Sequence, residues 1–283
     1  MIDVIKDTLF DSVKLLPFLF LAYLLMEYLE HKTGNKTKDI VKKSGKLGPL
    51  LGGIIGIFPQ CGFSAAAANL YAGKIITMGT LIAVFLSTSD EMLPILISEA
   101  APAGLILKIL AIKLVVGIIA GFIIDLVINV IGKTKKVEPE EAVGHMCEHD
   151  HCDCEHGIFK SALKHTINIF IFITIITFAI NTLIHFIGEE TIEKAIAGVP
   201  VLGILVSSIF GLIPNCAGSV IITELYLSNL ISFGSMIAGL LVGSGIGILV
   251  LFKSNKNIKE NLTITGLLML VGIIVGLIID FVI

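Results

Sequence analysis

Phe58-Pro59-Gln60-Cys61-Gly62 interrupts a long apolar stretch of the chain, and the related sequence Ile213-Pro214-Asn215-Cys216-Ala217 interrupts a second one. Proline removes a backbone donor and glycine permits unusual dihedral angles, so helices tend to end at such points. The apolar pieces around the first interruption, 47–58, 62–73 and 75–88, are shorter than an ordinary membrane span of about 20 residues. We therefore expect half-helices, hairpins or short tilted helices here.

The two interruptions belong to a longer internal repeat with a constant offset of 155 positions. Residues 117–125 align with 272–280 at this offset, and both segments carry a Gly-xxx-Gly pair and end in aspartate. Identical residues also recur between the breaks and these segments, among them Ser64, Tyr71, Gly79, Ala83 and Ser89. An internal duplication of this kind is common in membrane transporters.

The composition identifies the chain as a membrane protein. Of its 283 residues, 55% are hydrophobic and 15% are charged, whereas a soluble domain has about 25% charged residues. These values exclude a soluble globular enzyme, a nucleic-acid-binding protein and a disordered chain. Uninterrupted apolar stretches that could cross a bilayer lie near 15–30, 104–131, 166–187 and 261–283.

We therefore expect an all-α polytopic membrane protein with two inverted-topology repeats, broken or re-entrant helices and about ten helical segments. The first membrane repeat should occupy residues 1–131 and the second residues 159–283, with a connector at 132–158 between them. Three spans plus a re-entrant hairpin in each half, or five short spans in each half, both fit the sequence.

Lysine placement predicts the orientation. The loop 31–46 is rich in lysine, whereas its counterpart near 188–200 carries three glutamates and one lysine. The loop 98–103 has no lysine, and its counterpart carries Lys253, Lys256 and Lys259. Because lysine-rich loops favour the cytoplasmic side, we expect the connector inside, both termini outside, and a multi-pass protein of the cell (inner or plasma) membrane.

The paired interruptions are the first candidate binding site. Each supplies an amide and a thiol at the same point of the repeat: Gln60 and Cys61 in the first half, Asn215 and Cys216 in the second. In an inverted pair such points can meet near the membrane midplane, where freed carbonyls and helix ends line a site. The alternative is a simple kink with an inert buried cysteine.

Acidic residues inside apolar stretches are further candidates. Asp90 and Glu91 follow Ser87-Thr88-Ser89, and each acid costs about 2.5–3.5 kcal/mol to insert at the centre of a span. Carboxylates and hydroxyls suit hard or borderline cations. Asn69 and Glu224 are equivalent in the repeat and follow the paired cysteines. The alternative for all three acids is a position at a helix end near the interface.

We expect two further repeated features to serve the structure and not the binding of a substrate. Asp125 and Asp280 close the last helix of each half and should mark the membrane interface. The glycine pairs of the same two segments, at 117/121 and 272/276, indicate close helix packing rather than ligand contact.

The connector contains a dense tract of metal-binding residues, and thiolate with imidazole favours zinc, copper(I), cobalt or nickel over calcium or magnesium. Its spacing matches no zinc finger, so we expect a flexible loading or sensing segment; a solvated polar linker is the alternative. The candidate ligands are His145, Cys147, His149, His151, Cys152, Cys154 and His156.

The paired breaks, the sequence Ser87-Thr88-Ser89-Asp90-Glu91-Met92-Leu93-Pro94 and the His/Cys-rich connector together resemble a known group. It is the ten-transmembrane heavy-metal exporter family, related in name to arsenic permeases and also labelled as manganese transporters. The resemblance covers nearly the whole chain and implies ten helical segments and efflux of a metal or metalloid. The matching motif positions are Pro59, Gln60, Cys61, Asp90, Glu91, Pro214, Asn215 and Cys216.

The leading hypothesis is a secondary transporter, not an enzyme, that exports a divalent transition metal of the manganese or zinc type from a midplane site at the repeat interface. The metal is the substrate, the lipid bilayer is the other partner, and no cofactor or nucleic acid is expected. The sequence leaves open whether the protein is a monomer or a homodimer. It contains no nucleotide-binding motif, so we expect an ion gradient, of protons, to supply the energy.

Three alternatives remain at this stage. An arsenite or organoarsenical efflux permease would need the two thiols and not the acids. An intramembrane thiol redox enzyme would use Cys61 and Cys216, although no Cys-x-x-Cys pair supports it. A metal-sensing membrane protein that transports nothing would depend on the connector alone.

Overall fold

The computed structural model describes residues 13, 16–17, 20–21, 23–24, 47–58, 61–89, 92–131, 158–187, 200–215 and 217–282. Within these residues, helices are the only regular secondary structure. The first half contains the helix Leu47–Gly56, α3 (Cys61–Ala72), α4 (Met78–Ser87), α5 (Met92–Ser98) and α6 (Ala103–Ile131). The second half contains α8 (Ile158–Ile187), α10 (Pro200–Gly211), α11 (Ala217–Leu227), α12 (Phe233–Val242), α13 (Gly247–Ser254) and α14 (Ile258–Val282).

The helix boundaries follow the sequence repeat. α4 and α12 begin and end at equivalent positions. α3 and α11 end at equivalent positions, and α5 and α6 begin at positions equivalent to the starts of α13 and α14. The turns after α3 and α11 are also alike, because Lys74 and Asn229 both adopt a positive φ, 56° and 58°. The prediction of a helical polytopic protein built from two repeats is therefore confirmed.

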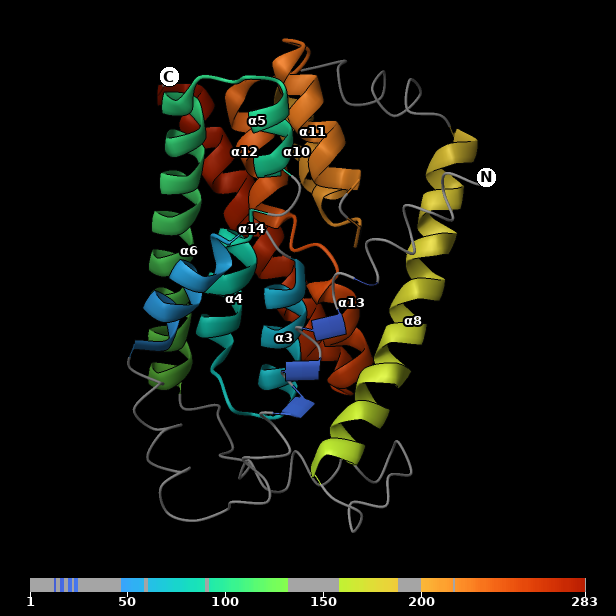
Figure 1. The fold of residues 1–283 in the computed structure, drawn as a ribbon. Helices are drawn as coiled ribbons and strands as arrows, with labels where there is room; N and C mark the ends of the chain where they lie inside the picture. The colour runs from blue at the N-terminus through green and yellow to red at the C-terminus, as the bar shows by residue number, and fades with distance from the viewer. Residues whose placement is uncertain are drawn as a thin grey trace.

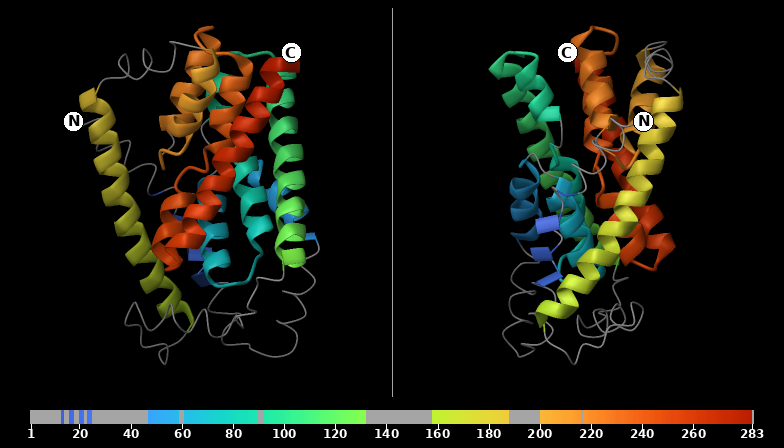
Figure 2. Two further views of the ribbon diagram at one scale, coloured as in Figure 1. Left: turned by 180° about the vertical axis from the view of Figure 1, so that it is seen from behind. Right: turned by 45° about the vertical axis from the view of Figure 1, so that its right-hand side comes forward.

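Equivalent helices run in opposite directions through the molecule. In Figure 1, α6 descends from its junction with α5 at the top, whereas α14 ascends to the C-terminus at the top. Figure 2 shows the same relation from behind. α6 ends and α8 begins on the lower side, which we call the connector side.

Helix length separates spans from hairpin pieces. The described residues contain stretches long and apolar enough to cross a membrane at Met78–Ser98, Ala103–Val130, Ala162–Ala179, Phe233–Ser254 and Ile258–Val282. The helix Leu47–Gly56 and its counterpart α10 are too short for this: ten to twelve residues reach about 15–18 Å of a hydrocarbon layer about 30 Å thick.

These short helices form re-entrant hairpins. In Figure 1 the helix Leu47–Gly56 rises to mid-height and α3 returns to the connector side, while α10 and α11 do the same from the opposite side. The second half thus contains three spans and a hairpin, the first of the two arrangements that the sequence allowed. In the first half, the span predicted near 15–30 lies largely outside the described residues.

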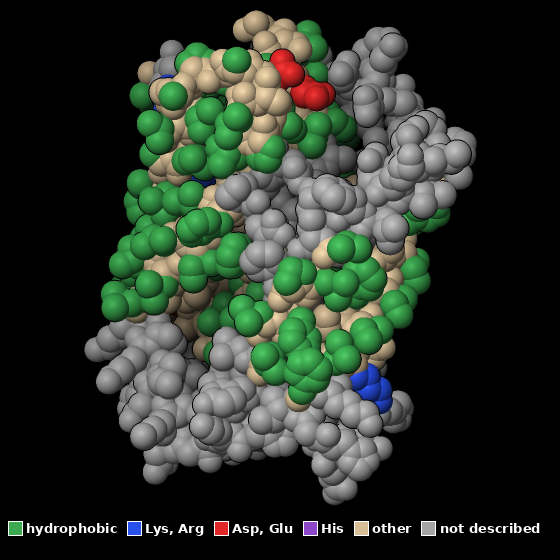
Figure 3. Space-filling model, in the orientation of Figure 1, with side chains coloured by type: hydrophobic (Ala, Val, Ile, Leu, Met, Phe, Trp, Pro, Cys, Tyr) green, Lys and Arg blue, Asp and Glu red, His purple; other side chains and the backbone are tan. Residues whose placement is uncertain are grey.

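The interrupted spans lie in the interior and the uninterrupted ones form the outer face. The spans α4–α5 and α12–α13 are 75% and 83% buried, against 22%, 29% and 28% for α6, α8 and α14. The described part of the face in Figure 3 is accordingly mostly hydrophobic. An apolar outer surface of this kind is suited to contact with lipid.

Glycines set the distance between α4 and α6. A Cβ added at Gly121 of α6 would lie 2.6 Å from the carbonyl oxygen of Gly79, so the two backbones touch. The second half repeats this contact, since a Cβ at Gly276 would lie 2.8 Å from the oxygen of Gly234. The interpretation of the Gly-xxx-Gly pairs as packing positions therefore agrees with the structure.

The repeated aspartates cap the inner helices. Asp125 accepts hydrogen bonds from the Thr77 hydroxyl at 2.7 Å and from the Gly79 N–H at 2.9 Å, at the start of α4. Asp280 accepts equivalent bonds from Ser232 and Gly234 at the start of α12. A carboxylate at a helix N-terminus satisfies free N–H groups and complements the helix dipole, so both aspartates fasten an inner helix to an outer one.

Replacing Gly121 by leucine should therefore destabilise the protein by more than about 2 kcal/mol, because the backbones of α4 and α6 would have to separate. The midpoint of thermal unfolding of the protein in detergent measures this. Gly266→Ala in α14 is the matched control, since a Cβ there meets no atom within 4 Å. An unchanged midpoint for Gly121→Leu would show that the helices are not in contact.

Candidate functional site

Four half-helices end or begin near the centre of the molecule. In Figure 1, α4 and α12 end at mid-height, and α3 and α11 begin there. Helix ends carry backbone groups without intrahelical partners, and no water is available in a bilayer core to satisfy them. This region is therefore polar within an otherwise apolar bundle, and it is the candidate site.

Hydroxyl groups form hydrogen bonds with backbone carbonyls at the break after α4. The Thr88 N–H donates to the carbonyl of Val84 at 3.0 Å, and the Thr88 hydroxyl donates to the same carbonyl at 2.8 Å. The Ser89 hydroxyl donates to the carbonyl of Ile57, near the tip of the first hairpin. Both side chains are buried. The break between α4 and α5 is thus joined to the hairpin through side-chain hydrogen bonds.

Glycines form the equivalent break after α12. The Gly243 N–H donates to the carbonyl of Gly239 at 2.9 Å, and Gly245 adopts a φ of 54°, which favours glycine. The Ser244 hydroxyl is buried and has no hydrogen-bond partner among the described residues. A Cβ added at Gly247 would lie 2.8 Å from Ser64 of α3, so the start of α13 lies against the other half.

A lysine lies among these helix ends. Lys113 is in the middle of α6, its side chain is 1% exposed, and its ammonium group donates a hydrogen bond to the carbonyl of Leu240 in α12. The Ser87 hydroxyl donates to the backbone carbonyl of Lys113 at 3.4 Å. Lys113 thus places a positive charge at the junction of the two repeats.

The second hairpin places one predicted residue in this region. Asn215 is 5% exposed, its N–H donates to the carbonyl of Ile213 at 2.7 Å, and its own carbonyl accepts from Gly218 at 3.4 Å. Cys61 is the first residue of α3. Gln60, Asp90, Glu91 and Cys216 lie outside the described residues, so their predicted roles stay predictions.

The predicted pair Asn69 and Glu224 lies further from the breaks. Asn69 is eight residues beyond the start of α3, about 12 Å along the helix axis. Its side-chain oxygen accepts from Tyr23 at 3.2 Å and from Ser254 at 2.7 Å, and its amide nitrogen is buried without a hydrogen-bond partner among the described residues. Glu224 is exposed on α11. The two equivalent positions therefore differ in surroundings.

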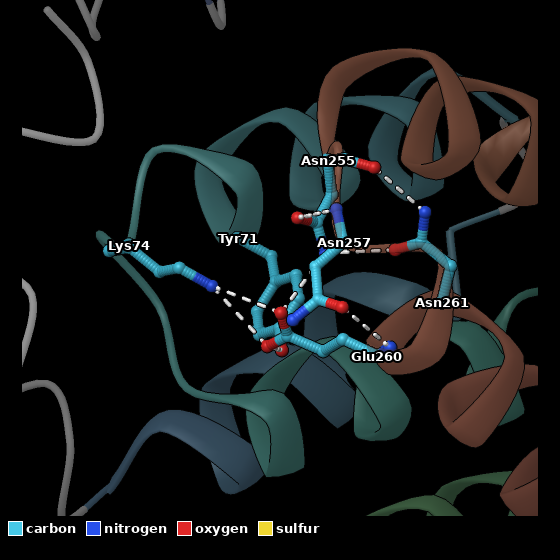
Figure 4. Close-up of polar contacts among 6 residues, drawn as sticks. All are labelled: Tyr71, Lys74, Asn255, Asn257, Glu260 and Asn261. Atoms are coloured by element: carbon cyan, nitrogen blue, oxygen red, sulfur yellow. Dashed lines mark hydrogen bonds and ion pairs between the residues drawn. The ribbon is translucent and has the colours of Figure 1, made fainter. Parts of the chain in front are cut away.

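A polar cluster joins the two repeats on the connector side (Figure 4). Glu260 at the start of α14 forms an ion pair with Lys74 at 3.3 Å and accepts a hydrogen bond from the Tyr71 hydroxyl. The Asn255 amide donates to Glu260 at 3.4 Å and to Asn261 at 2.8 Å. We call these five residues the connector-side cluster, and it fastens the end of α3 to the α13–α14 turn.

The equivalent junction on the opposite side is built differently. The positions that correspond to Asn255 and Glu260 are occupied by Ala100 and Leu105, which cannot form such a network. There, the Lys108 ammonium group lies 4.5 Å from the centre of the Phe233 ring, and the Tyr226 ring lies 5.7 Å from it. The two junctions are therefore held by different contacts: an ion pair and hydrogen bonds on the connector side, and cation–π and aromatic contacts on the opposite side.

The tract of the connector that was predicted to bind metal lies outside the described residues. It comprises His145, Cys147, His149, His151, Cys152, Cys154 and His156. Within the described residues, no three His, Cys, Asp or Glu side chains are close enough to hold a metal ion.

Sequence reasoning missed Lys113 and the connector-side cluster. A signal for Lys113 was available, because a lysine inside an apolar span marks a functional position by default. Tyr71 and Glu260 offered no comparable signal, since they are 189 positions apart and neither is unusual near a helix end.

Replacing Glu260 by glutamine should loosen the connector-side junction by about 1 kcal/mol, because the ion pair with Lys74 is lost and the remaining hydrogen bonds become neutral. We expect a lower unfolding temperature and faster amide hydrogen exchange in the α3–α4 turn. The neighbouring Lys259 is exposed, so Lys259→Gln serves as the control. Equal exchange in both variants would mean that the cluster does not hold the junction.

A family model described as "Putative, 10TM heavy-metal exporter" matches residues 1–186 and 158–283 of the chain. The two matches together extend over both repeats and overlap in α8. No curated protein and no solved structure gave a significant match.

Proposed function

Because the chain belongs to the 10TM heavy-metal exporter family, we propose that it is a secondary transporter that exports a divalent transition metal, of the manganese or zinc type, across the cell membrane. Membership of this family supports heavy-metal export as the general activity of the chain. The choice of a divalent cation rests on the acids and hydroxyls of the sequence.

One observation carries the proposal: broken helices from both repeats meet at mid-height around buried polar side chains. Ser87, Thr88 and Ser89 come from the first repeat, and Asn215 and Ser244 come from the second. Discontinuous helices that meet at the midplane offer carbonyl oxygens and helix ends to an ion. A purely structural bundle gains nothing from such costly breaks.

We assign the metal-binding groups to the residues that adjoin these breaks. Asp90 and Glu91 follow Ser89 directly and would supply carboxylate ligands, and Cys61 and Cys216 would supply thiolates. Gln60 and Asn215 would supply amide oxygens. Asn69 and Glu224, further along the hairpins, would line the path to and from the site.

The connector would deliver or sense the metal on the cytoplasmic side. Its thiols and imidazoles bind transition metals well, and it joins the ends of α6 and α8 on the connector side. The energy would come from a proton gradient. The two repeats would expose the central site to the two sides alternately, with the connector-side cluster closed in the conformation described here.

An arsenical substrate is the second candidate, because two cysteines occupy equivalent positions in the two repeats. Thiolates are soft ligands, and a neutral arsenical would not require the acids. The two candidates therefore differ in their dependence on Asp90 and Glu91.

Cells that produce the intact protein should contain less of one divalent metal than cells without it. The double variant Asp90→Asn/Glu91→Gln should lose at least about tenfold in export, because even the loss of a group that only supports a metal ligand costs about 10–100-fold in affinity or activity. Mass spectrometry of manganese, zinc, cobalt, nickel, copper and arsenic measures this. Glu99→Gln is the control, since Glu99 is an exposed acid in the α5–α6 turn. A fall in arsenic alone that survives in the double variant would contradict the cation assignment.

A further inference from the structure

Lys113 is the buried charge that the proposed ligand set leaves unexplained. It lies in the span Ala103–Val130, within an otherwise apolar part of α6, and its side chain is 1% exposed. A lysine at the centre of a span costs about 2.5–3.5 kcal/mol on insertion scales. A chain keeps such a residue where its charge is used.

The second repeat shows that packing does not require this lysine. The position equivalent to Lys113 is Leu268 in α14, which is also fully buried. α14 packs on α12 as α6 packs on α4, with glycines at the same positions. Because an apolar side chain serves the same packing in the same fold, the ammonium group of Lys113 has another purpose.

A hydrogen bond between the two repeats indicates what that purpose is. The ammonium group of Lys113 donates to the carbonyl of Leu240, in the last turn of α12 and in the other repeat. The last carbonyls of a helix lack intrahelical donors and carry its partial negative charge. Such oxygens attract any cation, including a metal ion. Lys113 therefore occupies a position that a cationic substrate would also favour.

We propose that Lys113 is the resident cation of the transport site: its ammonium group holds the end of α12 while no substrate is bound, and an incoming metal cation displaces it. This inference rests on the proposed function. The lysine competes with the metal for negative charge, so it weakens metal binding. The same competition drives the metal out, because the ammonium group returns to the α12 carbonyl as the metal leaves.

The proposal predicts opposite effects on KM and kcat. Without the ammonium group the metal meets no competitor, so KM should fall; metal release then has no replacement cation, so kcat should fall as well. A lysine that only stabilised the fold would behave differently, since its loss would raise KM or leave KM unchanged. Arginine keeps the charge and the donor groups, so Lys113→Arg should retain a kcat close to that of the intact protein.

The test is Mn²⁺ and Zn²⁺ transport by the full-length protein in proteoliposomes. For Lys113→Met, whose unbranched side chain fits a lysine-shaped space, we expect KM to fall about fivefold or more and kcat to fall about tenfold. Lys113→Leu, copied from the second repeat, is the alternative variant if the methionine protein does not fold. Lys259→Leu removes an exposed lysine from the start of α14, outside the proposed site and both junctions, and should leave both constants unchanged.

The outcomes separate this proposal from the proposed function. Failure of the intact protein to transport either metal would overturn the function itself. Transport by the intact protein, with a raised or unchanged KM in both the methionine and leucine variants, would overturn the role of Lys113 alone. A lowered KM with a lowered kcat, and a kcat recovered in Lys113→Arg, would support displacement.

Discussion

The absence of water in a bilayer core is the constraint on which this structure depends. Every backbone N–H and C=O at that depth needs a partner within the protein, so a helix can be interrupted only where other protein groups surround the break. The interrupted spans α4–α5 and α12–α13 therefore lie inside, behind the continuous helices α6, α8 and α14. The Thr88 and Ser89 hydroxyls then bond to carbonyls at one of these breaks.

Comparing equivalent positions of the two repeats shows which features both halves share and which only one half has. The glycine contacts between α4 and α6 recur between α12 and α14, and the caps made by Asp125 and Asp280 have the same geometry. These shared features build the scaffold. Lys113 and Glu260 are replaced by leucine at the equivalent positions, 268 and 105. These two side chains therefore belong to one half alone, unlike the paired cysteines and amides at the breaks.

The sequence predicted the fold better than the site. The prolines at 59 and 214 mark the breaks because the effect of proline on a helix is local, and the glycine pairs mark contacts because only small residues allow backbones to touch. Lys113 was missed because its span stays strongly apolar despite two lysines, so the hydropathy pattern does not mark it. The contact between Tyr71 and Glu260 depends on how two repeats pack, which no local pattern encodes.

The connector-side cluster would make the two end states of the proposed transport cycle differ in free energy. Two identical repeats of opposite orientation would give two states of equal free energy, related by a two-fold axis in the membrane plane. The ion pair and hydrogen bonds of Glu260 exist at one junction, while the other junction has aromatic and cation–π contacts. A difference of about 1.4 kcal/mol already shifts such an equilibrium tenfold. In the proposed transport cycle, the contacts of Glu260 would stabilise the conformation described here relative to one in which the connector-side cluster is broken.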